Sequence, residues 1–274
     1  MKSVTIVGAG AVGRSIALAL FYSRVKIAGV YSLNGTSARL LAKKVRCINF
    51  GTLSNKSLIT DIIIIAVPDN RIKDVVTSFI KNFGTVRDKI IFHTSGALTS
   101  DELIFLRKKG ASIASFHPLQ TFSRSKKQTS LKNIWCAVEG DRKAISTAQV
   151  LGKTLKMNVF TISKKDKLLY HASAVFASNY LVTLLSVVEE ISQIIHISKK
   201  NVWKIYSPLI LQTVQNVLHS SPIAALTGPI VRGDTKTVAK HIKALSTPKL
   251  KHLAMLYSAL GIETTRLIKK KNAR

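Results

Sequence analysis

Short, continuously apolar runs alternate with amphipathic segments over the first part of the chain. The run Ile62–Ile65 consists of isoleucine alone, which is typical of a strand buried on both faces of a parallel sheet. It is part of one of six strand-like runs, which are Val4–Val7, Val25–Tyr31, Arg46–Phe50, Asp61–Val67, Lys89–His93 and Ala111–Phe116. Helical periodicity lies between them at Val12–Tyr22, Ser37–Lys44, Ile72–Asn82 and Ser100–Lys109. The alternation predicts an α/β fold with a doubly wound parallel sheet, whose edge we expect Ile134–Val138 and Asn158–Thr161 to extend.

The second part of the chain shows helical periodicity only. Its apolar blocks are separated by proline and glycine and span Lys167–His196, Asn201–Val217, Thr235–Leu245 and Pro248–Lys269. We therefore predict a boundary near residue 163, with an α/β domain over residues 1–163 and an all-helical C-terminal domain over residues 164–274.

The segment Leu168–Val188 is nearly uncharged and long enough to span a membrane. It contains His171, Ser173, Ser178 and Asn179, however, and it runs directly into Glu189 and Glu190. We therefore expect no membrane span, but a helix that is buried in its own domain or in a homodimer.

The net charge of +29 is the one unusual property of the composition. An anionic partner such as nucleic acid would explain it, but so would a bias toward lysine. The charge is spread along the chain, and no aromatic residues interleave with the local clusters Arg124–Lys132 and Lys269–Arg274, as a base-stacking surface would require. We therefore expect no nucleic-acid partner.

The cysteines and the N-terminal region bear on compartment and metal binding. Cys47 and Cys136 lie far apart without metal-ligand spacing, which indicates buried thiols in a reducing compartment and no metal. A strand-like run already begins at residue 3, which leaves no cleavable, positively charged signal segment. We expect a cytoplasmic protein.

A glycine turn joins the first predicted strand to the first predicted helix. Its sequence, Gly8-Ala9-Gly10-Ala11-Val12-Gly13, matches the dinucleotide fingerprint of a Rossmann domain. The first glycine permits a tight turn, the second lets the backbone approach a pyrophosphate, and the third permits close packing of helix and strand. The pyrophosphate would lie at the helix N-terminus formed by Gly8, Gly10, Ala11, Val12 and Gly13. The alternative is a strand–helix turn without a ligand.

The end of the second predicted strand bears on which dinucleotide binds. NAD sites place an acidic residue about 20 residues after the glycines, but no Asp or Glu precedes Asp61. Ser32, Asn34 and Arg39 lie there instead and can donate to a 2′-phosphate, which predicts NADP(H) as cofactor. The alternative is a site that lacks the acid and accepts either cofactor. Backbone at Ala66, Val67 and Pro68, after the isoleucine strand, should line the cofactor.

Two histidines follow two consecutive predicted strands. His93 opens His93-Thr-Ser-Gly96, and His117 opens His117-Pro-Leu-Gln120. Since ligands of doubly wound sheets bind beyond the carboxyl ends of the strands, both are candidate catalytic residues, and Ser95 and Gly96 are candidate substrate contacts. A structural role beside a turn is the alternative for each histidine.

Polar residues mark one face of the first helix of the predicted second domain. Lys167 and His171 are four residues apart and share a narrow arc with Ser178. They are candidate proton donors, and Ser178 is a candidate substrate contact. Asn179 lies about 100° away from Lys167 by helical geometry and ranks below Ser178. An exposed lysine in a basic stretch is the alternative for Lys167.

Arg232 lies in a glycine-rich turn, Gly228–Asp234. It is the only arginine between Arg142 and Arg266, in a region rich in lysine. The planar guanidinium binds carboxylates with two parallel hydrogen bonds, which makes Arg232 a candidate for holding a substrate carboxylate. The alternative is a local pair with Asp234 that stiffens the turn.

Taken together, these motifs resemble those of Rossmann-like and DUF2520 domain-containing proteins. The resemblance rests on the glycine fingerprint, Ala66–Asp69, His93–Gly96, Phe116–Gln120, the segment from Lys167 to Ala174, and Gly228–Asp234. That family is similar to pyrroline-5-carboxylate reductases, ketopantoate reductases and the wider 6-phosphogluconate-dehydrogenase-like group, which are dimeric, NADP-linked and helical in their C-terminal domains. In these relatives a lysine followed four residues later by asparagine handles the substrate. Lys167 matches the lysine, whereas His171 replaces the asparagine.

The resemblance implies an NADPH-dependent reductase that acts on the C=O or C=N bond of a small carboxylate. A ketopantoate-like 2-keto acid is the first substrate we expect, and pyrroline-5-carboxylate is the second. The His117-Pro118 pair is also similar to that of prephenate dehydrogenases, which leaves a related enzyme as an alternative. An alternative of another class is a protein that binds NADP(H) without catalysis, or a basic protein associated with nucleic acid.

Overall fold

A computed structural model describes residues 3–54, 57, 59–83, 85–122 and 129–272. The chain forms two units, Met1–Asn179 and Tyr180–Arg274, each of which is described separately below.

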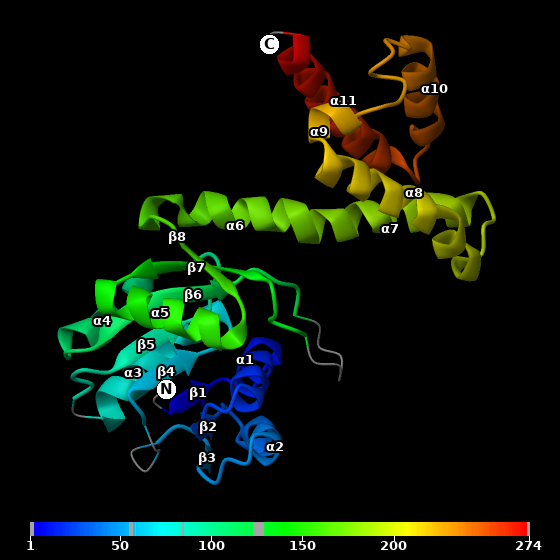
Figure 1. Ribbon diagram of the computed structural model, residues 1–274. Coiled ribbons are helices and arrows are strands. Elements are labelled where there is room, and N and C mark those ends of the chain that lie inside the picture. The colour runs from blue at the N-terminus through cyan, green and yellow to red at the C-terminus, as the bar shows by residue number, and fades with distance from the viewer. Residues whose placement is uncertain (1–2, 55–56, 58, 84, 123–128, 273–274) are drawn as a thin grey trace. The chain divides into compact units, whose positions relative to one another are not determined.

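A single eight-stranded sheet organises the described part of the first unit (Figure 1). Its strands follow the order β3-β2-β1-β4-β5-β6-β7-β8, and the first six positions reproduce the order of a Rossmann sheet. All neighbouring pairs are parallel except β6 and β7. The strands are β1 (Val4–Val7), β2 (Ile27–Tyr31), β3 (Phe50–Gly51), β4 (Ile62–Ile65), β5 (Ile90–His93), β6 (Ser112–Pro118), β7 (Trp135–Gly140) and β8 (Asn158–Thr161).

Helices cover both faces of the sheet, which explains why its central strands are apolar throughout. Side chains alternate across a strand, so Ile62 and Ile64 pack into one core layer while Ile63 and Ile65 pack into the other. The first layer is closed by α1 (Ala11–Tyr22), α2 (Thr36–Lys44) and α5 (Arg142–Leu155), and the second by α3 (Ile72–Asn82) and α4 (Ile104–Lys108). The predicted α/β fold with a doubly wound sheet is confirmed.

Three details of the sheet differ from the prediction. The strand expected at Arg46–Phe50 is wrong over most of its length, because Arg46 adopts a left-handed backbone (φ 52°) and pairing begins only at Phe50. β7 runs antiparallel to β6, although the pattern predicted a parallel sheet. Finally, α5 was not predicted.

The described part of the second unit consists of helices and their connections. These are α7 (Leu181–Ile194), α8 (Lys199–His219), α9 (Pro222–Ala225), α10 (Thr235–Leu245) and α11 (Lys251–Asn272). The helix that carries Lys167, α6 (Lys167–Val175), belongs to the first unit and continues into a π-helical turn at Phe176–Tyr180. The predicted domain boundary at residue 163 therefore precedes the division between the two units.

The helix expected to be buried is exposed within this chain. Leu168, Leu169 and Phe176 are 68%, 75% and 68% exposed, respectively, so burial in the helix's own domain is wrong for these residues. By length and composition alone, the helical stretch Lys164–Ile194 qualifies as a candidate membrane span. The second expectation, a helix covered by another copy of the chain, stays a prediction.

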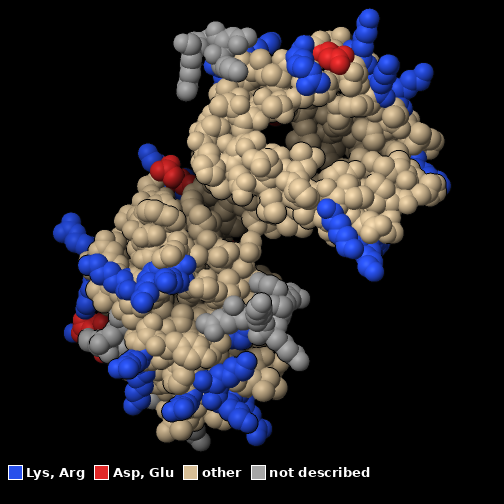
Figure 2. All heavy atoms as spheres, turned by 45° about the vertical axis from the view of Figure 1, so that its right-hand side comes forward, with Lys and Arg blue, Asp and Glu red and all other residues tan. Residues whose placement is uncertain are grey.

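Positive charge is distributed rather than concentrated. On the face drawn in Figure 2, lysine and arginine side chains are scattered over both units, and acidic side chains are few. Much of the predicted cluster Arg124–Lys132 lies outside the described residues, as do the last two residues of Lys269–Arg274. The scatter agrees with a compositional origin of the charge.

Candidate functional site

Two glycines of the fingerprint are required by the protein's own backbone. Gly8 has a φ of 108°, and a Cβ atom there would lie 2.1 Å from the carbonyl oxygen of Ala66. A Cβ atom on Gly13 would lie 1.9 Å from the carbonyl oxygen of Gly8. Both contacts are far shorter than van der Waals distance. These glycines therefore allow β1, β4 and α1 to pack at one point.

Gly10 differs from both of these glycines. It has an ordinary extended backbone (φ −71°, ψ −169°), and a Cβ atom there would meet nothing within 4 Å. It precedes α1, whose first N–H groups have no partners within the helix. The space in front of Gly10 is therefore open and faces a helix N-terminus, which suits a pyrophosphate. Residues Gly8, Gly10, Ala11, Val12 and Gly13 fit the dinucleotide role predicted for them.

A hollow of about 440 Å³ lies beyond the carboxyl ends of β1, β2 and β4. Ser32, Val67 and Pro68 line it as predicted, whereas Asn34 and Arg39 do not, although both lie exposed around the start of α2. The Ser32 hydroxyl accepts a hydrogen bond from the Ala38 N–H at 3.1 Å and so caps α2. The lining set is Val7, Ser32, Leu33, Thr52, Leu53, Val67, Pro68, Arg71, Asp74, Val75 and Ser78.

Arg71 is a lining residue that the sequence analysis missed. It follows the Pro68–Asn70 turn after β4, and its guanidinium pairs with Asp74 at 3.2 Å. The sequence signal that could have identified Arg71 is its position shortly after the end of β4. Arg71 is thus a cationic group in this hollow, with its charge paired to that of Asp74.

The two predicted histidines lie at neighbouring strand ends. β5 and β6 are parallel, with His93 opposite Ser115, so that His117 follows two residues beyond on β6. The expectation that these histidines share one edge of the sheet is confirmed. The same edge carries the glycine turn, since β1 is separated from β5 only by β4.

His93 and Ser95 hold the loop after β5. His93 is fully buried, its Nδ1 accepts from the Ser95 N–H at 3.2 Å, and its Nε2 lies 2.9 Å from the Thr99 carbonyl oxygen. The Ser95 hydroxyl donates to Asp69 at 2.8 Å and accepts from the Leu98 N–H at 2.9 Å. These contacts favour the structural alternative for His93.

Gly96, His117, Tyr170 and His171 form a second group, which we call the imidazole cluster. A Cβ atom on Gly96 would lie 2.5 Å from His171 Cδ2 and 2.8 Å from His117 Nε2. The phenol of Tyr170 lies 3.0 Å from His117 Nδ1. Only glycine at position 96 lets both imidazoles approach the loop. The structure thus brings together the predicted residues Gly96, His117 and His171, and adds Tyr170.

Lys167 lies in a buried polar network instead of facing solvent. Its ammonium donates to the Ser115 hydroxyl and lies 3.9 Å from a carboxylate oxygen of Glu139. Glu139 accepts from the Ser100 N–H at 2.6 Å and from the Ser100 hydroxyl at 2.8 Å. Ser115 in turn donates to the Ser95 carbonyl at 3.2 Å. These contacts rule out the exposed-lysine alternative and connect α6 to the loop that carries Gly96.

Burial sets the protonation states of this region. It lowers the pKa of His93 and of His117 to about 4, and the positive charge of Lys167 adds to the effect on His117. Burial also lowers the pKa of Lys167 from its usual value, against the raising effect of Glu139, and raises the pKa of Tyr170 to about 12. Near neutral pH the cluster therefore presents a neutral His117 and a protonated Tyr170.

The remaining predicted contacts are not part of this cluster. The ranking of Ser178 above Asn179 assumed a regular α-helix, and that assumption is wrong because the π-helical turn Phe176–Tyr180 changes the phase of the helix. Arg232 is exposed in the second unit, where Gly228 and Gly233 adopt left-handed backbone. In the same turn Asp234 caps α10 by accepting from the Thr237 N–H at 3.0 Å.

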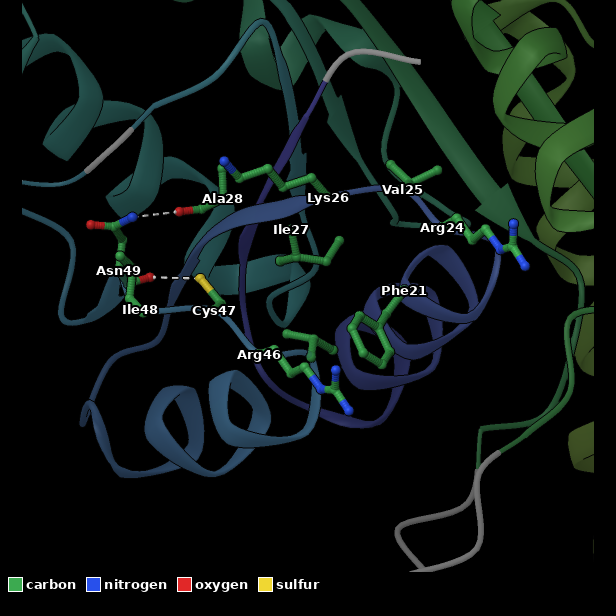
Figure 3. A pocket seen from close by; sticks show the side chains of 11 residues that line it. Phe21, Arg24, Val25, Lys26, Ile27, Ala28, Arg46, Cys47, Ile48 and Asn49 are labelled. Atoms are coloured by element: carbon green, nitrogen blue, oxygen red, sulfur yellow. Dashed lines mark hydrogen bonds between the residues drawn. The ribbon is translucent and has the colours of Figure 1, made fainter.

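A larger hollow, of about 570 Å³, lies at the opposite edge of the sheet. Arg24, Lys26 and Arg46 line it, together with apolar residues and the Cys47 thiol. Figure 3 shows the three cationic side chains with their charged ends pointing in different directions. They do not converge on one point, so the hollow does not gather these cationic groups into an anion site.

The sequence matches two protein-domain families. The Rossmann-like domain matches residues 1–118, and DUF2520, a domain of unknown function, matches residues 134–264. The chain contains a Rossmann-like domain followed by a DUF2520 domain. The DUF2520 match begins before β7, so it includes Glu139, Lys167, Tyr170 and His171. No curated protein sequence matches the chain.

Solved structures match this chain over nearly its whole length. A Bacteroides fragilis protein provisionally assigned as an NADP oxidoreductase is 22% identical, with a TM-score of 0.80 and coverage of 97% of this chain and 98% of the other. A Thermotoga maritima protein is 23% identical, with a TM-score of 0.75 and coverage of 98% and 99%. A pyrroline-5-carboxylate reductase of Coxiella burnetii is 14% identical, with a TM-score of 0.57 and coverage of 97% and 98%. Because these sequence identities are low, the similarity shows a shared fold and does not by itself show a shared activity.

Proposed function

We propose that this DUF2520 protein is an NADP(H)-dependent reductase acting on the C=O or C=N bond of a small carboxylate. One observation carries the proposal: the open helix N-terminus at Gly10 and the imidazole cluster lie at the same edge of one sheet. Strands are spaced about 4.8 Å apart, so the end of β1 and the ends of β5 and β6 are separated by roughly 10–15 Å. An extended dinucleotide spans that distance.

The fold comparisons support the same proposal. Structures with this fold include an Aspergillus terreus reductive aminase in complex with NADPH and a Plasmodium falciparum pyrroline carboxylate reductase with NADP bound. Their TM-scores are 0.61 and 0.59. The lack of an acid before Asp61, with Ser32 and Arg71 lining the hollow beyond the strand ends, supports NADP(H) over NAD(H).

The bound cofactor supplies the hydride, and the protein's residues position and polarise the acceptor. We assign proton donation to His171, whose ring is partly exposed and lies beside Gly96. His117 orients the acceptor atom, and Lys167 holds the Gly96 loop through Ser115. Arg232 is our proposed partner for the substrate carboxylate, with Ser178 and Asn179 as further proposed contacts. A ketopantoate-like 2-keto acid is the first proposed substrate, and pyrroline-5-carboxylate is the second.

We further propose a cytoplasmic homodimer. The exposed apolar side chains of α6 and α7, including Leu168, Leu169 and Val182, supply a surface that a second copy of the chain would cover.

A panel of 2-keto acids and cyclic imines tests the proposed reaction. With NADPH, we expect at least one member to cause loss of the reduced nicotinamide absorbance. His171→Ala should lower turnover by about 10²–10⁴-fold, the usual contribution of a positioned proton donor, without changing NADPH affinity. His219→Ala is the matched control, because His219 is exposed on α8 and bonds only within its own helix in the described structure.

Two outcomes would argue against the proposed reaction. Absence of NADPH oxidation with every substrate would favour a cofactor-binding protein without catalysis. Equal activity of the His171→Ala and His219→Ala variants would remove His171 from the mechanism.

A further inference from the structure

A hydrogen bond joins the side chains of Tyr170 and His117, which come from elements far apart in the sequence. Tyr170 comes from α6 and His117 from the end of β6, and the phenol oxygen lies 3.0 Å from Nδ1. The two rings meet edge to face, with centroids 5.7 Å apart. A half-buried phenol needs a partner, and in the described part of the chain the Tyr170 hydroxyl finds it in His117.

The position of the proton in this bond has a consequence for the other ring nitrogen. A neutral imidazole carries one proton, so a nitrogen that accepts a hydrogen bond leaves the proton on the other nitrogen. The imidazole nitrogen is a far stronger base than a phenol oxygen, which makes Tyr170 the donor and Nδ1 the acceptor. Nε2 then carries the proton.

Nε2 of His117 is also the nitrogen that faces the loop. It lies 2.8 Å from the position of a Cβ atom on Gly96, in space that the glycine leaves free. His171 borders the same space from α6. A donor at Nε2 therefore points to where a substrate atom would lie if the proposed reductase function holds.

We infer that Tyr170 is a positioning residue that fixes His117 as the Nε2–H tautomer, so that His117 offers a neutral hydrogen-bond donor to the acceptor oxygen or nitrogen of the substrate. This inference rests on the proposed function for the substrate's identity, but the tautomer itself is a property of the free protein.

The charged and titratable groups around His117 agree with a neutral ring. Tyr170 and His171 face it from α6, and Lys167, from the same helix, disfavours an imidazolium by its own positive charge. The carboxylate of Glu139 pairs with Lys167, 3.9 Å away. Burial of His117 acts in the same direction as Lys167 and keeps its pKa low, at about 4.

The tautomer can be measured without any substrate or cofactor. Long-range ¹H–¹⁵N correlation NMR spectra at pH 7, recorded on protein with ¹⁵N-labelled histidine side chains, should show His117 with an unprotonated Nδ1 and a protonated Nε2. The signals are assigned by their loss in His117→Gln. In Tyr170→Phe the ring remains but the donor is gone, and we expect a mixture of both tautomers. A protonated Nδ1 in the wild type, or an unchanged spectrum in Tyr170→Phe, would overturn the inference.

Kinetics provide a second test once a substrate is found. The side-chain amide nitrogen of glutamine can replace Nε2, whereas asparagine reaches only as far as Nδ1. We expect His117→Gln to retain at least tenfold more kcat/KM than His117→Asn. Tyr170→Phe should lower the kcat/KM of the wild type in proportion to the fraction of His117 that loses the Nε2 proton, about twofold for an equal mixture of tautomers. It should have little effect in the His117→Gln background, because an amide has no tautomer to fix. An equal loss in both backgrounds would contradict the inference and indicate a merely structural role.

The two proposals can fail separately. A panel without any turnover removes the reductase function and leaves the spectra to decide the tautomer. Turnover together with a protonated Nδ1 retains the reductase and rejects the role of Tyr170.

Discussion

Replacing Lys167 by methionine is expected to lower the free energy of unfolding by about 3–5 kcal/mol, the range found when one partner of a buried ion pair is removed. The side chain of Lys167 is 0% exposed and that of Glu139 is 2% exposed. Without the ammonium, the carboxylate retains its two hydrogen bonds from Ser100 but loses its compensating charge. Urea denaturation of the variant and the wild type measures the loss.

Two further variants separate charge from packing. Lys165→Met changes an exposed neighbour and should leave the free energy of unfolding within about 0.5 kcal/mol of the wild type. Glu139→Gln combined with Lys167→Met removes the unpaired charge and keeps an amide beside Ser100, so we expect it to recover most of the loss. A Lys167→Met variant as stable as the wild type would show that this network does not hold α6 on the sheet.

Substitution at Gly10 and at Gly13 should separate binding from folding. Gly10→Val places its Cβ atom in open space with an allowed backbone, so the free energy of unfolding should fall by no more than about 1 kcal/mol, the scale of an N-cap substitution. NADPH affinity should fall more than about tenfold, because the valine occupies the space that the pyrophosphate needs. The matched variant Gly13→Ala should be destabilised by at least about 1–3 kcal/mol, since its Cβ atom overlaps the Gly8 carbonyl.

Calorimetric titration with NADPH and urea denaturation of both variants provide the measurement. If Gly10→Val bound NADPH as tightly as the wild type, the cofactor would not approach the backbone at this turn. If Gly13→Ala were as stable as the wild type, the packing of β1 against α1 would tolerate a side chain there.

Local sequence signals were sufficient to predict the α/β fold, and to place the glycine turn and the two strand-end histidines of the candidate site. The glycine fingerprint and the isoleucine strand depend on neighbours in sequence, and both form as predicted. His93 and His117 could be placed at one sheet edge because parallel strands align their carboxyl ends. The missed helix α5 also carried a signal, since Ala144, Ala148, Leu151 and Leu155 repeat with helical spacing and are buried.

The rest of the site depends on contacts between residues far apart in the chain. Glu139, Ser115 and Tyr170 were not predicted, because nothing near them in sequence shows that Lys167 and His117 would be their partners. The π-helical turn after Val175 changed the face on which Ser178 and Asn179 lie, and periodicity alone does not reveal such a turn. The predicted boundary at residue 163 separates strands from helices, yet Lys167 anchors the first of those helices to the sheet.

The central claim is that a nicotinamide dinucleotide binds at the glycine turn of the first unit. Calorimetric titration of the wild-type protein with NADPH, and separately with NADH, tests it most directly. We expect one NADPH to bind per chain, more tightly than NADH, because Ser32 and Asn34 follow β2 and no acidic residue precedes Asp61. Absence of binding by both dinucleotides would contradict the account.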